Sequence, residues 1–105
     1  MSTVTGTFRG RATIEAGNTP TIYNVSVPLA NTEVSQALSS STKRFLIRVR
    51  GNANLKMAFT LGDSGSNYIT VPHGCSYTED SINFTGTIYF QTNVAGQVVE
   101  ILEWS

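Results

Sequence analysis

The chain of 105 residues has few of the residue types on which many protein chemistries depend. Its one cysteine, Cys75, excludes an internal disulfide and a cysteine-based zinc site. Its one histidine, His73, excludes a metal site built from several histidines and acid–base catalysis by a histidine pair. We therefore expect one domain, residues 1–105, with no metal and no cofactor.

Charge is also scarce, since Asp, Glu, Lys and Arg make up 13% of the chain and the formal net charge is zero. A neutral chain is not expected to bind nucleic acid, because phosphate contacts need a surplus of Lys and Arg. There is no apolar run of about 18 residues, the length that spans a bilayer, and no basic-then-apolar leader. We expect no membrane span and no secretion signal. Hydroxyl and amide residues replace the missing charge, with 14 Thr, 11 Ser and 8 Asn.

Lys and Arg are absent from the second half of the chain. All seven basic residues lie within residues 1–56, and from residue 57 onward only acidic residues carry charge. One interpretation is that opposite charges pair across neighbouring strands of the folded subunit. The other is a polarised surface that steers subunits together. The order of the residues alone does not decide between them.

The dominant hydrophobic period is two, which predicts half-buried strands. Residues 43–50 (KRFLIRVR) place Phe45, Ile47 and Val49 on one face, and Arg44, Leu46, Arg48 and Arg50 on the other. Residues 55–59 repeat the alternation. Because Gly51 and Asn52 separate the two runs, we predict that they form a hairpin.

Other segments extend this pattern. We expect strands at residues 3–8, 11–15, 21–27, 67–71, 75–77, 82–90 and 97–104, and turns at 72–74 (PHG) and 93–96 (NVAG). Residues 33–38 fit either a helical turn or an irregular strand, and residues 39–42 (SSST) an exposed connection. Strands this short and regularly spaced predict an all-β fold, an antiparallel β-sandwich that is jelly-roll-like or another Greek key, with seven to nine short strands.

No arrangement of residues predicts catalysis. His73 lies in a tight turn with no orienting partner at a recognisable spacing, so we expect an exposed turn histidine. Cys75 has only acidic charges nearby, and we predict a buried or semi-buried, inert thiol. We place Glu79 and Asp80 in a solvated turn, and Glu100 with Glu103 on a solvated outer face, rather than in a glycosidase pair. We expect a protein that is not an enzyme.

One surface arrangement remains as a candidate. If Val99 faces inward, Leu102 and Trp104 face outward with Glu100. Aromatic residues, Arg and partnering charges on an outer sheet face are typical of protein–protein contacts. The alternative is that Trp104 folds over the edge of the core as a plug. The predicted interface set is Arg44, Leu46, Arg48, Arg50, Tyr89, Glu100, Glu103 and Trp104.

The same basic run also invites a nucleic-acid interpretation. A strand that binds single-stranded nucleic acid presents aromatic side chains and basic charges on one surface. Here Phe45 and the arginines of residues 44–50 point to opposite faces of the strand. We therefore favour structural pairing of these charges over nucleic-acid binding.

Three segments in the second half, RFLIRVRGNANLKMAFTLG, NYITVPHG and GTIYFQTNVAGQVVEILEWS, resemble small virion structural proteins of tailed bacteriophages. The resemblance implies a non-enzymatic capsid decoration (cement) protein, or a neck or tail component, assembled in the host cytoplasm. Implied partners are the chain itself, as a dimer or trimer, and the major capsid protein or another virion protein. The alternatives are a carbohydrate-binding or adhesive module of a tail or fibre, and a small hydrolase.

Overall fold

The computed structural model describes residues 19–80 and 84–105. The strands expected at 3–8 and 11–15 and the start of the one expected at 82–90 lie outside these residues. The described strands are β1 (Pro20–Val27), β2 (Val34–Ala37), β3 (Arg44–Val49), β4 (Leu55–Ala58), β5 (Ile69–Val71), β6 (Tyr77–Glu79), β7 (Thr87–Thr92) and β8 (Gln97–Trp104). A short 3-10 helix, η1 (Asp63–Gly65), lies between β4 and β5.

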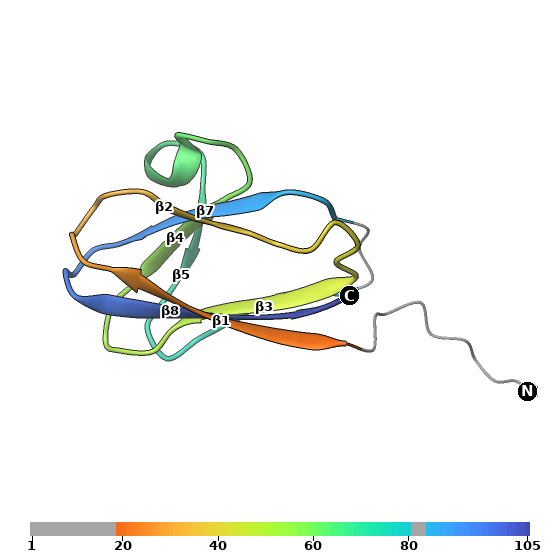
Figure 1. The fold of residues 1–105 in the computed structure, drawn as a ribbon. Coiled ribbons are helices and arrows are strands. Elements are labelled where there is room, and N and C mark those ends of the chain that lie inside the picture. The colour runs from red at the N-terminus through yellow and green to blue at the C-terminus, as the bar shows by residue number, and fades with distance from the viewer. Residues whose placement is uncertain (1–18, 81–83) are drawn as a thin grey trace, which may run out of the picture.

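The strands form two four-stranded antiparallel sheets packed face to face (Figure 1). The first has the order β1-β8-β3-β6 and the second β2-β7-β4-β5. The first strand pairs with the last, the second with the seventh, the third with the sixth and the fourth with the fifth. This nesting, in which each sheet takes alternate pairs, is the jelly-roll arrangement. The predicted all-β sandwich of seven to nine strands is confirmed.

Alternation of apolar and polar residues builds the core between the two sheets. Phe45 and Ile47 of β3 are fully buried, as are Ile88 and Phe90 of β7, which approach them from the opposite sheet. Fully burying a side chain of this size stabilises the fold by about 1.5–3 kcal/mol. The rest of the core comes from the same alternation in other strands, with Val27, Leu55, Met57, Val99 and Ile101.

The predicted hairpin between residues 43–50 and 55–59 is wrong. β3 pairs with β6 and β8, whereas β4 belongs to the other sheet and pairs with β5 and β7. The connection between them crosses the core edge, where Ala53 is buried. Two neighbouring strands with one apolar face each can pair side by side or pack face to face. Their alternation does not distinguish these arrangements.

Several smaller predictions are settled as well. Residues 33–38 contain a true strand, β2, rather than a helical turn. The strand expected from Cys75 begins only at Tyr77 and includes Glu79, which was expected in a solvated turn and is partly buried opposite Phe45. Thr42, expected in an exposed connection, is fully buried. The two predicted turns are confirmed, and each ends on a glycine with positive φ, 78° at Gly74 and 72° at Gly96, a conformation that glycine adopts without strain.

The outer faces of the two sheets differ in their covering. The loop that carries η1 lies over the second sheet (Figure 1). The carboxylate of Glu33 holds it there, accepting hydrogen bonds from the backbone N–H of Gly62 (2.8 Å) and from the hydroxyl of Ser64 (2.6 Å). The hydrogen bond from the Ser64 hydroxyl, followed by those from the backbone N–H groups of Gly62 and Ser64, lowers the pKa of Glu33. Among the described residues, no such loop covers the first sheet.

Candidate interaction surface

The outer face of the first sheet carries an apolar row across three strands. The registers place Ile22 of β1 opposite Leu102 of β8, and Leu102 opposite Leu46 of β3. Ile22 is 68% exposed. Because alternate residues of these strands point into the core, the three apolar side chains gather on the solvent face of the sheet.

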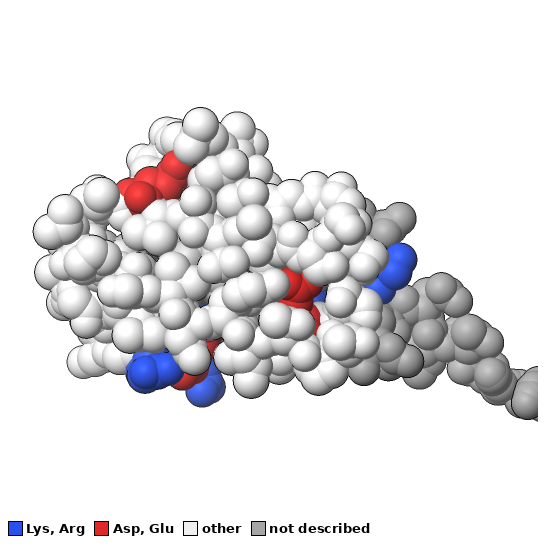
Figure 2. Space-filling model, in the orientation of Figure 1, with Lys and Arg blue, Asp and Glu red and all other residues white. Residues whose placement is uncertain are grey.

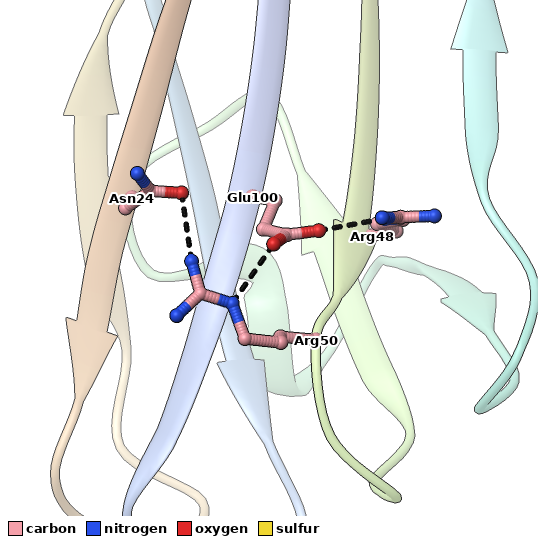
Figure 3. Close-up of polar contacts among 4 residues, drawn as sticks. All are labelled: Asn24, Arg48, Arg50 and Glu100. Carbon is pink, nitrogen blue, oxygen red and sulfur yellow. Dashed lines mark hydrogen bonds and ion pairs between the residues drawn. The ribbon is translucent and has the colours of Figure 1, made fainter.

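A charged group borders this row on one side. Glu100 of β8 accepts hydrogen bonds from Nε of Arg48 (2.7 Å) and from Nε of Arg50 (2.8 Å), and the Arg50 guanidinium also donates to the Asn24 carboxamide (3.1 Å), as Figure 3 shows. The bond from Arg50, followed by that from Arg48, lowers the pKa of Glu100. The group thus bridges β1, β8 and β3 and stays ionised at neutral pH.

Trp104 and Arg44 border the apolar row on its other side. Trp104 lies opposite both Pro20 and Arg44, and the guanidinium carbon of Arg44 is 4.2 Å from the centroid of its ring. Arg44 also forms an ion pair with Asp80, at 3.0 Å from Nε to the carboxylate oxygen. Its Nε–H is not aimed at that oxygen, so the contact is not a hydrogen bond. Trp104 therefore packs on the outer face, in a cation–π contact.

The centre of this face is hollowed into an open groove of about 370 Å³. Its side chains come from both the apolar row and the charged group: Ile22, Asn24, Leu46, Arg48, Glu100 and Leu102. An apolar centre with a polar rim and an adjacent aromatic residue is the composition of a protein–protein contact. Nothing in this groove pairs a nucleophile with a base.

Six of the eight predicted interface residues lie together on this face; Tyr89 and Glu103 do not. Tyr89 points outward as predicted, but from β7 of the second sheet, where it lies opposite Ser35 and Ala58. It is therefore on the far side of the sandwich from the groove. The sequence placed Tyr89 on an outer face correctly and could not tell which sheet that face belonged to.

Glu103 was predicted on the solvated outer face, and this is wrong, because its side chain is fully buried. Position 103 continues the inward series of Val99 and Ile101 along β8. Its carboxylate accepts hydrogen bonds from the hydroxyl of Tyr23, from the hydroxyl of Thr42 (2.5 Å) and from the backbone N–H of Ser39 (3.2 Å). The bond to Glu103, together with burial, raises the pKa of Tyr23 to about 12.

The charges pair within the subunit. Each of the three ion pairs between described residues joins an arginine of the first half to an acidic residue of the second: Arg44 to Asp80, and Arg48 and Arg50 to Glu100. Figure 2 shows basic and acidic side chains next to each other at the lower edge of the molecule. The interpretation of cross-strand pairing is confirmed for these groups.

The turn at residues 72–76 contains the chain's one histidine and one cysteine. His73 is exposed, as predicted. Cys75 is exposed too, so the predicted buried or semi-buried thiol is wrong. Its backbone N–H bonds to the carbonyl of Pro72 (3.1 Å) within the turn.

Sequence reasoning missed two residues of the surface, Ile22 and Asn24. The signal is present in the sequence: in the strand predicted at residues 21–27, Tyr23, Val25 and Val27 alternate on one face, which assigns the even-numbered residues to the other. What was lacking was the knowledge that this strand lies beside β8.

Comparison with protein-family models, curated proteins and solved structures finds no match to this chain. Within residues 19–80 and 84–105, no helix is long and apolar enough to cross a membrane. The same residues contain no group of three or more His, Cys, Asp or Glu arranged to hold a metal ion.

Proposed function

We propose that this chain is a non-enzymatic structural protein of a tailed-phage virion, a capsid decoration (cement) protein, which acts through repeated protein–protein contacts with itself and with a major capsid or other virion protein. The observation that carries the proposal is the groove on the outer face of the first sheet, with Ile22, Leu46 and Leu102 at its centre. The resemblance of three segments in the second half to small virion structural proteins supports it.

The physics of a capsid suits a small surface of this kind. A decoration protein binds a lattice that repeats the same site many times. Contacts that are modest singly become strong when several subunits bind neighbouring sites together. A face with few apolar residues and internally paired charges stays soluble as a free subunit and still offers a contact to a matching partner.

The fold is compatible with this function without establishing it. Jelly-roll sandwiches occur in viral capsid domains and also in lectins. A fold does not determine function, which depends on the residues at the surface that the fold presents. The exposed aromatic side chains favour assembly over sugar binding, because Tyr68 lies on the second sheet's side, away from Trp104.

The direct test is to look for the protein in purified particles of the phage that encodes it. We expect mass spectrometry to detect the chain in intact virions and immunoelectron microscopy to place it on the capsid surface. Leu46→Asp should reduce its incorporation at least about tenfold, since a buried unpaired carboxylate costs more than 1.4 kcal/mol at an apolar contact. Leu61→Asp is the matched control, because Leu61 is 74% exposed and lies in the η1 loop outside the groove.

Other results would redirect or reject the proposal. Absence of the protein from particles would reject a virion role. Equal incorporation of Leu46→Asp and Leu61→Asp would reject the groove as the contact. Binding of the isolated monomer to a glycan array, lost on substitution of Trp104, would favour the carbohydrate-binding alternative. Turnover of generic ester or glycoside substrates that disappears in His73→Ala would favour a hydrolase.

A further inference from the structure

β1 is the longest strand at the edge of either sheet among the described residues. It has eight residues, whereas the other three edge strands, β2, β5 and β6, have four, three and three. One side of β1 pairs with β8 along its whole length. No described strand pairs with the other side, so a long row of backbone groups lies along an open edge.

The hydrogen bonds show which backbone groups face that edge. Thr19 and Ser105 exchange two hydrogen bonds, Thr19 N–H to Ser105 O at 3.2 Å and Ser105 N–H to Thr19 O at 3.1 Å. In an antiparallel ladder, such an exchange recurs at every second pair. The odd-numbered residues of β1 therefore bond to β8. The N–H and C=O groups of Ile22, Asn24 and Ser26 point the other way, toward the open edge.

This edge lacks the charged side chains that usually prevent strands from associating. Natural edge strands are protected by charged residues, above all Lys, by proline, or by being short. The sequence of β1, PTIYNVSV, contains no charged residue, and its one proline, Pro20, begins the strand. Pro28 follows the strand, so the edge-facing N–H groups of Ile22, Asn24 and Ser26 lie between two prolines.

We propose that β1 pairs in antiparallel fashion with β1 of a second copy of this chain, about a two-fold axis at Asn24. The proposal rests on the self-association included in the proposed function and specifies its geometry. With Asn24 opposite itself and Ile22 opposite Ser26 of the second copy, every edge-facing N–H and C=O of these three residues has a partner. The two first sheets become one continuous eight-stranded sheet.

A second copy suits this edge because the edge-facing N–H and C=O groups of Ile22, Asn24 and Ser26 are arranged symmetrically about Asn24. A two-fold contact uses the same surface twice, so it needs groups that complement themselves. Asn24, at the axis, is neutral and its carboxamide is already bonded by Arg50. The charges nearest the axis belong to the group around Glu100, in which two arginines share one carboxylate, so each copy has one excess positive charge there. The side chains of Arg48 and Arg50 are more than half exposed, so solvent and salt screen the repulsion between the two copies.

Hydrogen exchange measured amide by amide on the full chain tests the proposal. Sedimentation first defines concentrations at which the protein is monomeric and associated. We expect the amides of Thr21, Tyr23 and Val25 to be protected at both concentrations, because they bond to β8. The amides of Ile22, Asn24 and Ser26 should exchange rapidly in the monomer and at least about tenfold more slowly in the associated protein.

A matched pair of variants tests the same bonds independently. Ser26→Pro removes an edge-facing N–H without removing a bond to β8, and Ser26→Ala keeps that N–H. We expect Ser26→Ala to associate like the original chain and Ser26→Pro to associate at least about tenfold more weakly, since a lost hydrogen bond and the proline ring together exceed 1.4 kcal/mol. Protection of the odd-numbered amides shows that either variant is folded.

The remaining outcomes each overturn the proposal. A protein that is monomeric at every concentration has no such dimer. Slow exchange of the even-numbered amides in the monomer means that the edge is filled by the chain itself. Association without their protection means that copies meet elsewhere. This last result would reject the β1 dimer but not the proposed virion function. Absence of the protein from particles would reject the virion function but not the β1 dimer.

Discussion

At the scale of single residues, the least expected feature is the buried carboxylate of Glu103. It connects three parts of the chain that are far apart in sequence, through Tyr23 of β1, Thr42 before β3 and Ser39 of the preceding loop. A buried carboxylate is tolerable only when donors satisfy it, and these donors depend on it in turn. Glu103 therefore acts as a structural residue.

Glu103→Ala should lower the free energy of unfolding by about 3 kcal/mol, because it leaves two hydroxyls and one N–H buried without their acceptor. For a chain of this size the melting temperature should fall by roughly 15 °C. Glu103→Gln, which keeps the shape and one acceptor, should lose less. Glu100→Ala, at a partly exposed carboxylate, is the control and should lose at most about 1 kcal/mol, since its arginine partners are more than half exposed and solvent screens these ion pairs. Equal losses of unfolding free energy in Glu103→Ala and Glu100→Ala would contradict the structural role of Glu103.

Tyr23 makes the free energy of unfolding depend on pH in the alkaline range. Its pKa is raised from 10.0 to about 12 in the folded protein, chiefly by the hydrogen bond to Glu103. A group whose folded pKa exceeds its unfolded value stabilises the fold fully below the unfolded pKa and loses that effect as the pH rises to the folded one. The contribution of Tyr23 is thus complete below pH 10 and declines from pH 10 to 12.

Denaturant unfolding across that pH range checks this expectation. The midpoint of unfolding should fall with rising pH in the original chain and fall less in Tyr23→Phe, which has no proton to lose. Tyr77, whose pKa is raised to about 12 by Glu79, should behave in the same way. A decline that is identical in the original chain and in the double variant with both tyrosines replaced by Phe would show that other groups cause it.

At the scale of elements, the two outer faces of the sandwich differ, because among the described residues a loop lies over only one of them. The loop with η1 is tied to the start of β2 by Glu33, and it buries Ser64 and most of Gln91. That loop covers part of the second sheet, beside which Phe59 and Ile69 remain 44% exposed. The first sheet keeps its groove and the open edge of β1, so both proposed contacts belong to the same layer.

Replacing Glu33 with Gln should loosen this loop without unfolding the sandwich. The amides of Gly62 and Ser64 donate to the carboxylate of Glu33, and bonds to a charged acceptor are stronger than bonds to a neutral one. We expect hydrogen exchange at these two amides to accelerate about tenfold, which corresponds to 1.4 kcal/mol. The amides of β3 should not change; if they accelerate equally, the effect is global destabilisation.

At the scale of the whole molecule, the net charge is zero and three arginines are paired with acidic residues of the same subunit. The contacts proposed for a partner are backbone groups along β1 and apolar side chains in the groove. Neither depends on long-range attraction between opposite charges. Association of such subunits is expected to be governed by shape and hydrogen bonding.

Self-association should therefore be nearly independent of salt. Raising the ionic strength from about 0.05 to about 0.5 M shortens the screening length severalfold, yet it leaves uncharged contacts in place. We expect the dissociation constant from sedimentation to change by less than about threefold, or 0.65 kcal/mol. A weakening of about tenfold or more would contradict this and would revive the interpretation of a polarised, charge-steered surface.

The sequence by itself determined which residues face inward. The alternation of Phe45 with Leu46 and Arg48 specified both faces of β3, and the same rule, applied consistently, would have placed Glu103 with Val99 and Ile101. Turns were readable because glycine at Gly74 and Gly96 tolerates a backbone that other residues avoid. These properties are local, so a few neighbouring residues are enough to fix them.

Only the tertiary structure decided which strands are neighbours. β3 lies beside β8, more than fifty residues later in the chain, and not beside β4, which follows it directly. This pairing of strands places Ile22 and Asn24 near Glu100. It also places Tyr89 on the opposite side of the molecule, in the second sheet. Strand partners are selected by how two whole sheets enclose one core, a condition that no single segment of sequence expresses.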